Sequence, residues 1–335
     1  MSRRNIVLLA AILLAASALF AGAAAYRRAH PLPSLVRLGG DAGDESPQGR
    51  AVQTFLRLLE ERGHGRVVVR PFLDASIGNE ETLAPKVQQG VVEAAVLSRP
   101  LWRFDPAWQV FDLPWTITDQ QDMARLWSQA GPDLEQRLLS QRLVLGSLWS
   151  GGEVAVFSRR PLSRDSDWQG LSFFSGPTPA GARGAEALGA TASHGALDRE
   201  REAVRAGAAE AYAAPVALAG TFGPPPPYVL EGYGELPVLL VFSRDWWERQ
   251  PEDVRQLLLS CARDAAPASQ AAARAAEEEA RRSWQAAGVK VGGPPPLRGL
   301  AGARQAGFQS FASQLSPELQ PVFSAILEAG ATPRP

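Results

Sequence analysis

A regular alternation of short apolar runs with amphipathic stretches, in the first third of the chain, constrains its fold most. Residues 36–38, 66–72 and 94–97 are leucine-containing or β-branched runs that predict strands. Between the first two runs, apolar residues recur at helical spacing: Val52, Phe55, Leu56 and Leu59. A second helical stretch runs toward Gly90, and Pro85 either kinks it or marks its first turn. This order predicts parallel strands with right-handed crossovers, in an α/β fold with a ligand crevice at the carboxyl ends of its strands.

The second half of the chain repeats the alternation with different lengths. Apolar runs predict strands over 143–149, 154–158 and 238–243, and helical patterns cover 181–188 and 199–206. A long helix follows: Pro251, Glu252 and Asp253 supply a proline and acids for its first turn. Its pattern persists to about Ala287, so roughly 35 residues at 1.5 Å each give about 50 Å. A helix of that length would span both lobes of a two-domain protein.

The N-terminus has the layout of an export signal. Arg3 and Arg4 precede an uninterrupted apolar run over 6–25 that closes with small residues. The pair of arginines weakly resembles a twin-arginine signal. Because 20 apolar residues also suffice to span a bilayer, an uncleaved N-terminal anchor is the alternative. We therefore expect residues 1–25 to be a signal peptide or anchor, and the protein to be periplasmic.

Composition and motif spacing exclude several classes of function. The chain has 335 residues, 45% of them hydrophobic, and a formal charge of -1, which gives no electrostatic reason to expect nucleic acid as a partner. The histidines, His30, His64 and His194, are isolated and show no metal-ligand spacing. The lone Cys261 sits at apolar helical spacing and is predicted to be buried. We expect no enzyme, no metal site and no cofactor.

Six segments, in order, match a known family. They are Ile-Gly-Asn-Glu at 77–80, Val-Gln-Gln-Gly-Val-Val-Glu-Ala at 87–94, Val-Phe-Asp-Leu-Pro-Trp at 110–115, Asp-Trp-Gln-Gly-Leu at 167–171, Ala-Leu-Gly-Ala at 187–190, and Phe-Ser-Arg-Asp-Trp-Trp with Gln-Pro-Glu at 242–252. Together they resemble the solute-binding subunits of tripartite ATP-independent periplasmic (TRAP) transporters, of the dicarboxylate type.

The resemblance implies a fold and a mechanism. Two α/β lobes, joined by crossing strands and braced by the long helix, would close over a small molecule. The first lobe would comprise residues 35–150 and 240–283, and the second 151–239 and 284–330. The closed protein, expected to be a monomer, would then deliver the ligand to a two-component membrane permease.

The sequence departs from the family at the positions expected to hold the ligand. Phe174 stands where the family usually places an arginine that clamps a ligand carboxylate. A second family cation corresponds to Glu153 or to Val154. A family acid or amide falls on Leu97, and a family asparagine on Ala214. One helix further on, Arg183 offers a displaced cation, although a solvated helix residue is the ordinary interpretation.

Two interpretations follow from these departures. In the first, the protein binds a less polar ligand in an aromatic pocket formed by Phe174, Trp149, Trp102 and Tyr212. In the second, ligand binding has been lost and the fold serves as an interaction module in the cell envelope. The first predicts weak binding of C4-dicarboxylates and better binding of aromatic, amphipathic or cationic solutes, because a buried carboxylate without a charged partner is strongly penalised.

Overall fold

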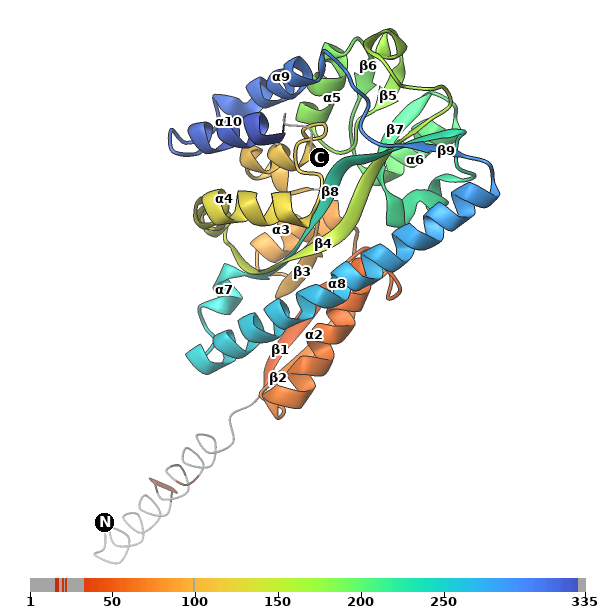
Figure 1. Ribbon diagram of the computed structural model, residues 1–335. Helices are drawn as coiled ribbons and strands as arrows, with labels where there is room; N and C mark the ends of the chain where they lie inside the picture. The colour runs from red at the N-terminus through yellow and green to blue at the C-terminus, as the bar shows by residue number, and fades with distance from the viewer. Residues whose placement is uncertain (1–15, 18–19, 21, 23–32, 99, 331–335) are drawn as a thin grey trace, which may run out of the picture.

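The computed structural model describes residues 16–17, 20, 22, 33–98 and 100–330 (Figure 1). The predicted signal segment at 1–25 lies mostly outside these residues. Within the described part of the chain, no helix has both the length and the apolar character needed to cross a membrane.

The first strands and helices form the predicted parallel unit. Strands β1 (Ser34–Gly39), β2 (Val67–Phe72) and β3 (Ala94–Leu97) are parallel, in the order β2-β1-β3. The crossover helices are α2 (Pro47–Gly63) and α3 (Glu80–Gln88), and Pro85 lies inside α3. Ser46 and Asn79 cap the two helices by accepting backbone N–H bonds.

Two long antiparallel strands cross the whole molecule (Figure 1). They are β4 (Leu143–Ser158) and β8 (Tyr228–Ser243), paired from Leu143↔Ser243 to Ser158↔Tyr228. The two strands predicted at 143–149 and 154–158 are therefore one strand. The residues between the two predicted strands form an irregularity in the pairing with β8 after Ser150, where Gly152 adopts a φ of +89°. A side chain there would be strained and would crowd α8.

The remaining strands extend the same nine-stranded mixed sheet. Its order is β2-β1-β3-β8-β4-β7-β5-β6, with β9 paired to β8. The added strands are β5 (Ser172–Phe174), β6 (Thr191–Ser193), β7 (Ala211–Pro215) and β9 (Lys290–Gly292). Helices α5 (Pro179–Ala187) and α6 (Leu197–Arg205) confirm the two helices predicted in this half.

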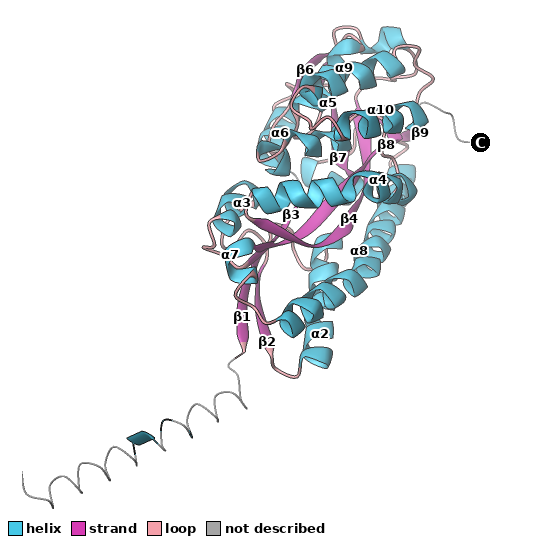
Figure 2. Cartoon of the chain, turned by 90° about the vertical axis from the view of Figure 1, so that its left-hand side faces the viewer, coloured by secondary structure: helices cyan, strands magenta, loops and turns pink. Residues whose placement is uncertain are grey.

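The predicted long helix is present as α8 (Glu252–Ala286) and runs along both halves of the molecule (Figures 1 and 2). Its N-terminal half buries Leu258 and Cys261 in a core with β1, α2 and β8, which confirms the expected burial of Cys261. Its C-terminal end buries Trp284 in a second core, where the ring meets Phe157 edge-on. The helix thus braces two separate cores, as its length predicted.

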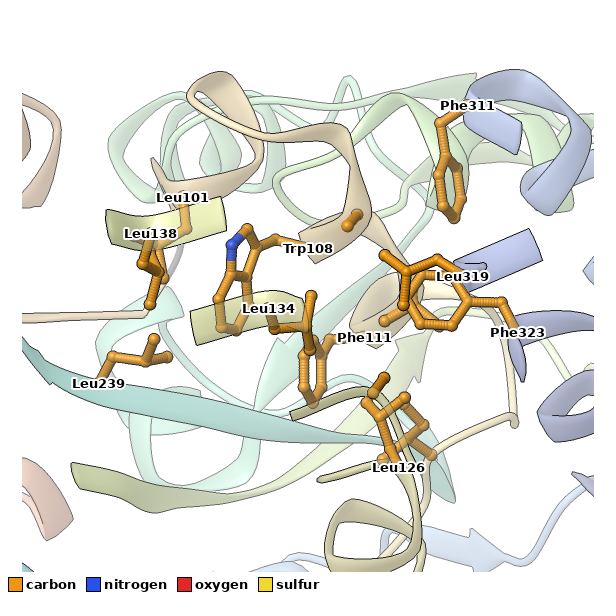
Figure 3. Close-up of a cluster of buried hydrophobic side chains, with 14 of the residues drawn as sticks. Leu101, Trp108, Phe111, Leu126, Leu134, Leu138, Leu239, Phe311, Leu319 and Phe323 are labelled. Carbon is orange, nitrogen blue, oxygen red and sulfur yellow. The ribbon is translucent and has the colours of Figure 1, made fainter. Parts of the chain in front are cut away.

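The C-terminal helices close the other face of the sheet. Figure 3 shows apolar side chains from η2 (Pro106–Asp112), α4 (Gln120–Ser140), α9 (Leu300–Ala312) and α10 (Leu319–Gly330) meeting in one cluster. Phe323 of α10 packs there with α4. The other elements are η1 (Pro100–Arg103), η3 (Asp165–Trp168), η4 (Val216–Phe222) and α7 (Arg244–Trp247).

Candidate functional site

A cavity of about 200 Å³ lies between two parts of the molecule, called here its halves: the first carries β1, β2 and β3 with α2 and α3, and the second carries β5, β6 and β7 with α5 and α6. The first half contributes the residues after β1 and β3, together with α2, α3 and η1. The second half contributes Pro177, the loop at Gly195–Leu197, and the helices α6 and η4. Leu236 of the crossing strand β8 also lines it. This is the crevice at the carboxyl ends of strands that the alternating pattern predicted.

Two hollows of about 20 Å³ each continue the cavity along the crossing strands. They share Pro177 and Leu236 with it, and they are otherwise lined mainly by apolar or small groups. Val154, Ser175 and Ala213 line the hollow that lies deepest in the second half. Two carboxyl side chains interrupt this apolar lining, because Asp112 borders both hollows and Glu235 borders one.

Charge is unevenly distributed around the cavity. Asp41, Glu80 and Glu81 line it from the first half. Glu80 accepts a bond from Ser98 Oγ at 2.7 Å, and Glu81 accepts one from Arg103 at 2.9 Å. Among the described residues, Arg201 is the one cationic side chain in the lining. Asp198 of α6 lines the cavity beside Arg201. The first half thus contributes carboxylates, whereas the second contributes a guanidinium together with one carboxylate.

Trp102 is the predicted site residue that lines this cavity. It lies in η1, and its ring meets His194 of the other half edge-on at 6.3 Å between centroids. Arg103 stacks over the same ring at 5.7 Å. Trp102 is therefore placed to contact a ligand and to form part of the contact between the two halves.

Phe174 and Tyr212 lie one layer behind the cavity. Both are buried in the core of the second half, where Tyr212 stacks between Phe157 and Phe222. Burial raises the pKa of Tyr212 above its ordinary value. A Cβ added to Gly195, which lines the cavity, would lie 3.6 Å from Phe174 Cζ. These rings support the cavity wall.

Trp149, Leu97 and Ala214 are fully buried in the cores and are absent from the cavity lining. Trp149 lies under α8, and its indole Nε1 donates to the Ala262 carbonyl at 2.9 Å. Arg183 is exposed on α5 and pairs with Glu186 at 2.8 Å. The structure does not bring these four residues to the cavity.

Glu153 faces α8 instead of the cavity. It accepts bonds from Gly232 N at 2.6 Å and from Arg281 Nη2 at 2.7 Å, and it is the register partner of Glu235. Glu235 accepts bonds from Ser150 Oγ and Gln120 Nε2. Burial raises the pKa of each glutamate to about 7, with further contributions from Glu277 and other carboxylates. The paired glutamates lie at the irregular point of the crossing strands.

Arg201 was missed by the sequence analysis. It stands four residues after Leu197 and three before Val204, and both of these pack against the core. That helical spacing puts Arg201 on the inner face of α6, unlike Arg199, which is exposed. The spacing is a signal by which the residue could have been found.

Comparisons with known proteins agree with this architecture. The model for bacterial extracellular solute-binding proteins of family 7 matches residues 38–301. The C4-dicarboxylate-binding periplasmic protein DctP of Rhodobacter capsulatus is 21% identical over 274 residues, which cover 77% of this chain and 79% of that protein.

Two solved structures have the same fold. A TRAP periplasmic solute-binding protein of Chromohalobacter salexigens with bound D-glucuronate matches with a TM-score of 0.78 at 20% identity, over 88% of this chain and 99% of that one. A similar protein of Shewanella oneidensis with bound succinate matches with a TM-score of 0.77 at 18% identity, over 89% of this chain and 99% of that one.

Proposed function

Because the chain belongs to family 7 of the bacterial extracellular solute-binding proteins, we propose that it captures a small organic solute between its lobes for delivery to a membrane permease. The observation that carries the proposal is the cavity between the two halves, bordered by the carboxyl ends of strands from both. A solute there would contact both lobes at once. It would thereby favour the closed arrangement by its differential affinity.

The cavity lining suggests how the solute is held. Trp102 and Leu236 would supply apolar contact, while Ser98 and Gln48 would supply hydrogen bonds. Phe174 and Tyr212 would keep the wall rigid from behind. We propose this set in place of a lining that includes Leu97, Trp149, Ala214, Glu153 and Arg183.

Relatives of the chain suggest the chemical class of the solute. Structures of relatives carry D-glucuronate and succinate, which are organic acids. We propose that this protein also takes an organic acid, and that it does so as a periplasmic monomer exported by its N-terminal segment. The partner would be a two-component permease of the TRAP type.

We propose binding without catalysis. His64 follows the C-terminus of α2 and His194 lies between β6 and α6, so the structure keeps them apart; His30 lies outside the described residues. In the described chain, no three His, Cys, Asp or Glu side chains form a group that could hold a metal ion. We propose that the solute leaves the cavity chemically unchanged, as expected of a binding protein.

Ligand binding should stabilise the protein and make it more compact. A solute at a hundredfold excess over its Kd should raise the free energy of unfolding by about 2.7 kcal/mol. Melting temperature and small-angle scattering, measured with a library of organic acids, amines and neutral metabolites, check this. If no solute changes either quantity, the protein is instead the interaction module with lost ligand binding.

A further inference from the structure

We propose that Arg201 binds the carboxylate of the solute, and that the solute is a monocarboxylate with an apolar or aromatic body. This inference rests on the proposed function, because it concerns the same cavity. Arg201 lies on α6 in the second lobe, at a later position in the chain than Phe174, where the family usually places its arginine.

The Arg201 guanidinium is held in place by its own lobe. Its Nε donates to Thr221 Oγ1 at 3.1 Å, and its central carbon lies 5.9 Å from the centre of the Phe222 ring. Thr221 is itself fixed, because its hydroxyl donates to the Leu218 carbonyl at 2.7 Å. A guanidinium oriented in this way loses little conformational entropy when it binds a ligand.

The same guanidinium keeps donors for a ligand. Nη1 makes only a long contact of 3.4 Å with Asp198, whose side chain is 78% exposed. Within the described chain, Nη2 donates to no side chain. Because Arg201 lines both the inter-lobe cavity and a wider recess between α6 and η4, a solute can reach it. A carboxylate can thus displace the weak Asp198 contact and accept a charge-assisted bond.

The opposite wall limits the solute to one carboxylate. Asp41, Glu80 and Glu81 line the first-lobe side of the cavity. Glu81 is offset by Arg103 at 2.9 Å, and Arg103 does not line the cavity. A dicarboxylate bound to Arg201 at one end would direct its other end toward this acidic wall, and like charges repel. A second carboxylate therefore lowers affinity here.

The rest of the cavity favours an apolar body. Trp102, Leu197, Leu218 and Leu236 line it. The hollows along the crossing strands add Phe111, and their carboxyl side chains, Asp112 and Glu235, disfavour a second carboxylate on the solute. The cavity volume of about 200 Å³ is below the roughly 300–1,000 Å³ typical of ligand pockets, so the solute must be small. An arylacetic acid has both features that these groups require, namely one carboxylate and one flat apolar ring.

Calorimetric titration at neutral pH with phenylacetate and with phenylacetamide tests the inference, because the two probes share a shape and differ in charge. The native protein should bind phenylacetate about ten- to hundredfold more tightly than the amide, the ratio expected for a hydrogen bond to a charged group. Arg201→Gln should abolish this difference in affinity by weakening the binding of phenylacetate. Arg201→Lys should leave an intermediate difference, because lysine keeps the positive charge but lacks the paired N–H donors of the guanidinium.

Two further arginines provide controls. Arg183→Gln removes an exposed cation of the same lobe and should leave the ratio unchanged. Arg99→Gln is included because Arg99 follows the cavity residue Ser98 in the sequence. Unchanged melting temperatures of the free variants confirm that each is folded.

Several results would overturn the assignment. They are a ratio retained in Arg201→Gln, a ratio lost in Arg99→Gln alone, tighter binding of succinate than of phenylacetate, or binding of some other solute by a protein that takes neither probe. In each case the proposed function stands. If no solute of any class binds, the proposed function fails together with the inference.

Discussion

Replacing Trp149 with alanine should lower the free energy of unfolding by about 3–5 kcal/mol in the absence of any ligand. The side chain is 1% exposed and packs between the crossing strand β4 and helix α8. Alanine leaves a cavity there and removes the bond from the indole to the Ala262 carbonyl. Urea denaturation of the free protein measures the loss.

Phenylalanine at the same position separates packing from hydrogen bonding. Trp149→Phe keeps most of the apolar volume and loses the N–H donor, so its cost should be nearer 1 kcal/mol. If alanine left stability unchanged but abolished solute binding, Trp149 would line the ligand site, as the sequence suggested, and its placement under α8 would be contradicted.

Stability should fall as the pH rises from about 4.5 to about 7, and Glu235→Gln should remove much of that fall. Burial, helped by the charges of Glu277 and Glu153, raises the pKa of Glu235 to about 7 from its ordinary value of 4.5. A carboxyl group whose pKa is higher in the folded than in the unfolded protein contributes its full stabilisation of the fold at pH values below the unfolded pKa. That contribution is lost as the pH climbs to the folded pKa.

The expected size is up to about 3 kcal/mol for one carboxyl, since each pKa unit corresponds to about 1.4 kcal/mol. As the pH falls, we expect Glu235 to take up a proton before Glu153 does. Glu153 stays charged more readily because the guanidinium of Arg281 lies 2.7 Å away. The neighbours that set this balance are Glu231 on β8, Glu277 and Arg281 on α8, and the uncharged Gln120 and Ser150.

Melting curves across this pH range, for the native protein and two variants, check the prediction. Glu235→Gln should be more stable than the native protein above pH 7 and similar to it near pH 4.5. Glu279→Gln, which removes an exposed carboxylate of α8, should follow the native curve. Parallel curves for the native protein and Glu235→Gln would show that Glu235 is ionised throughout.

Much of the fold could be predicted because its signals are local or periodic. The alternation of apolar runs with amphipathic stretches predicted β1, β2 and β3 as parallel strands, and the 35-residue helical pattern predicted α8. The break at Gly151 and Gly152 suggested two strands, whereas the structure has one. A glycine with positive φ bends β4 without ending it, and the continuous pairing with β8 is a long-range property that no local pattern records.

The site was harder to predict because strands alternate their faces. Residues adjacent to three of the predicted positions line the cavity or its hollows: Ser98 beside Leu97, Ser175 beside Phe174, and Ala213 beside Ala214. Of the two alternatives Glu153 and Val154, Val154 lines a hollow and Glu153 faces α8. Successive side chains of a strand point to opposite faces, so an alignment shift of one residue exchanges core and cavity. Trp102 lines the cavity as it stands, and it lies in a 3-10 helix, where this alternation of faces does not apply.

The cavity between the lobes is expected to hold a small organic solute. Native mass spectrometry of the protein purified under mild conditions, followed by denaturation and identification of what is released, tests it directly. We predict one organic acid per chain, displaced by phenylacetate and absent from a variant in which Trp102→Ala and Arg201→Gln are combined. Ligand-free protein that also fails to take up any solute from a metabolite extract would show that the cavity does not bind a small organic solute.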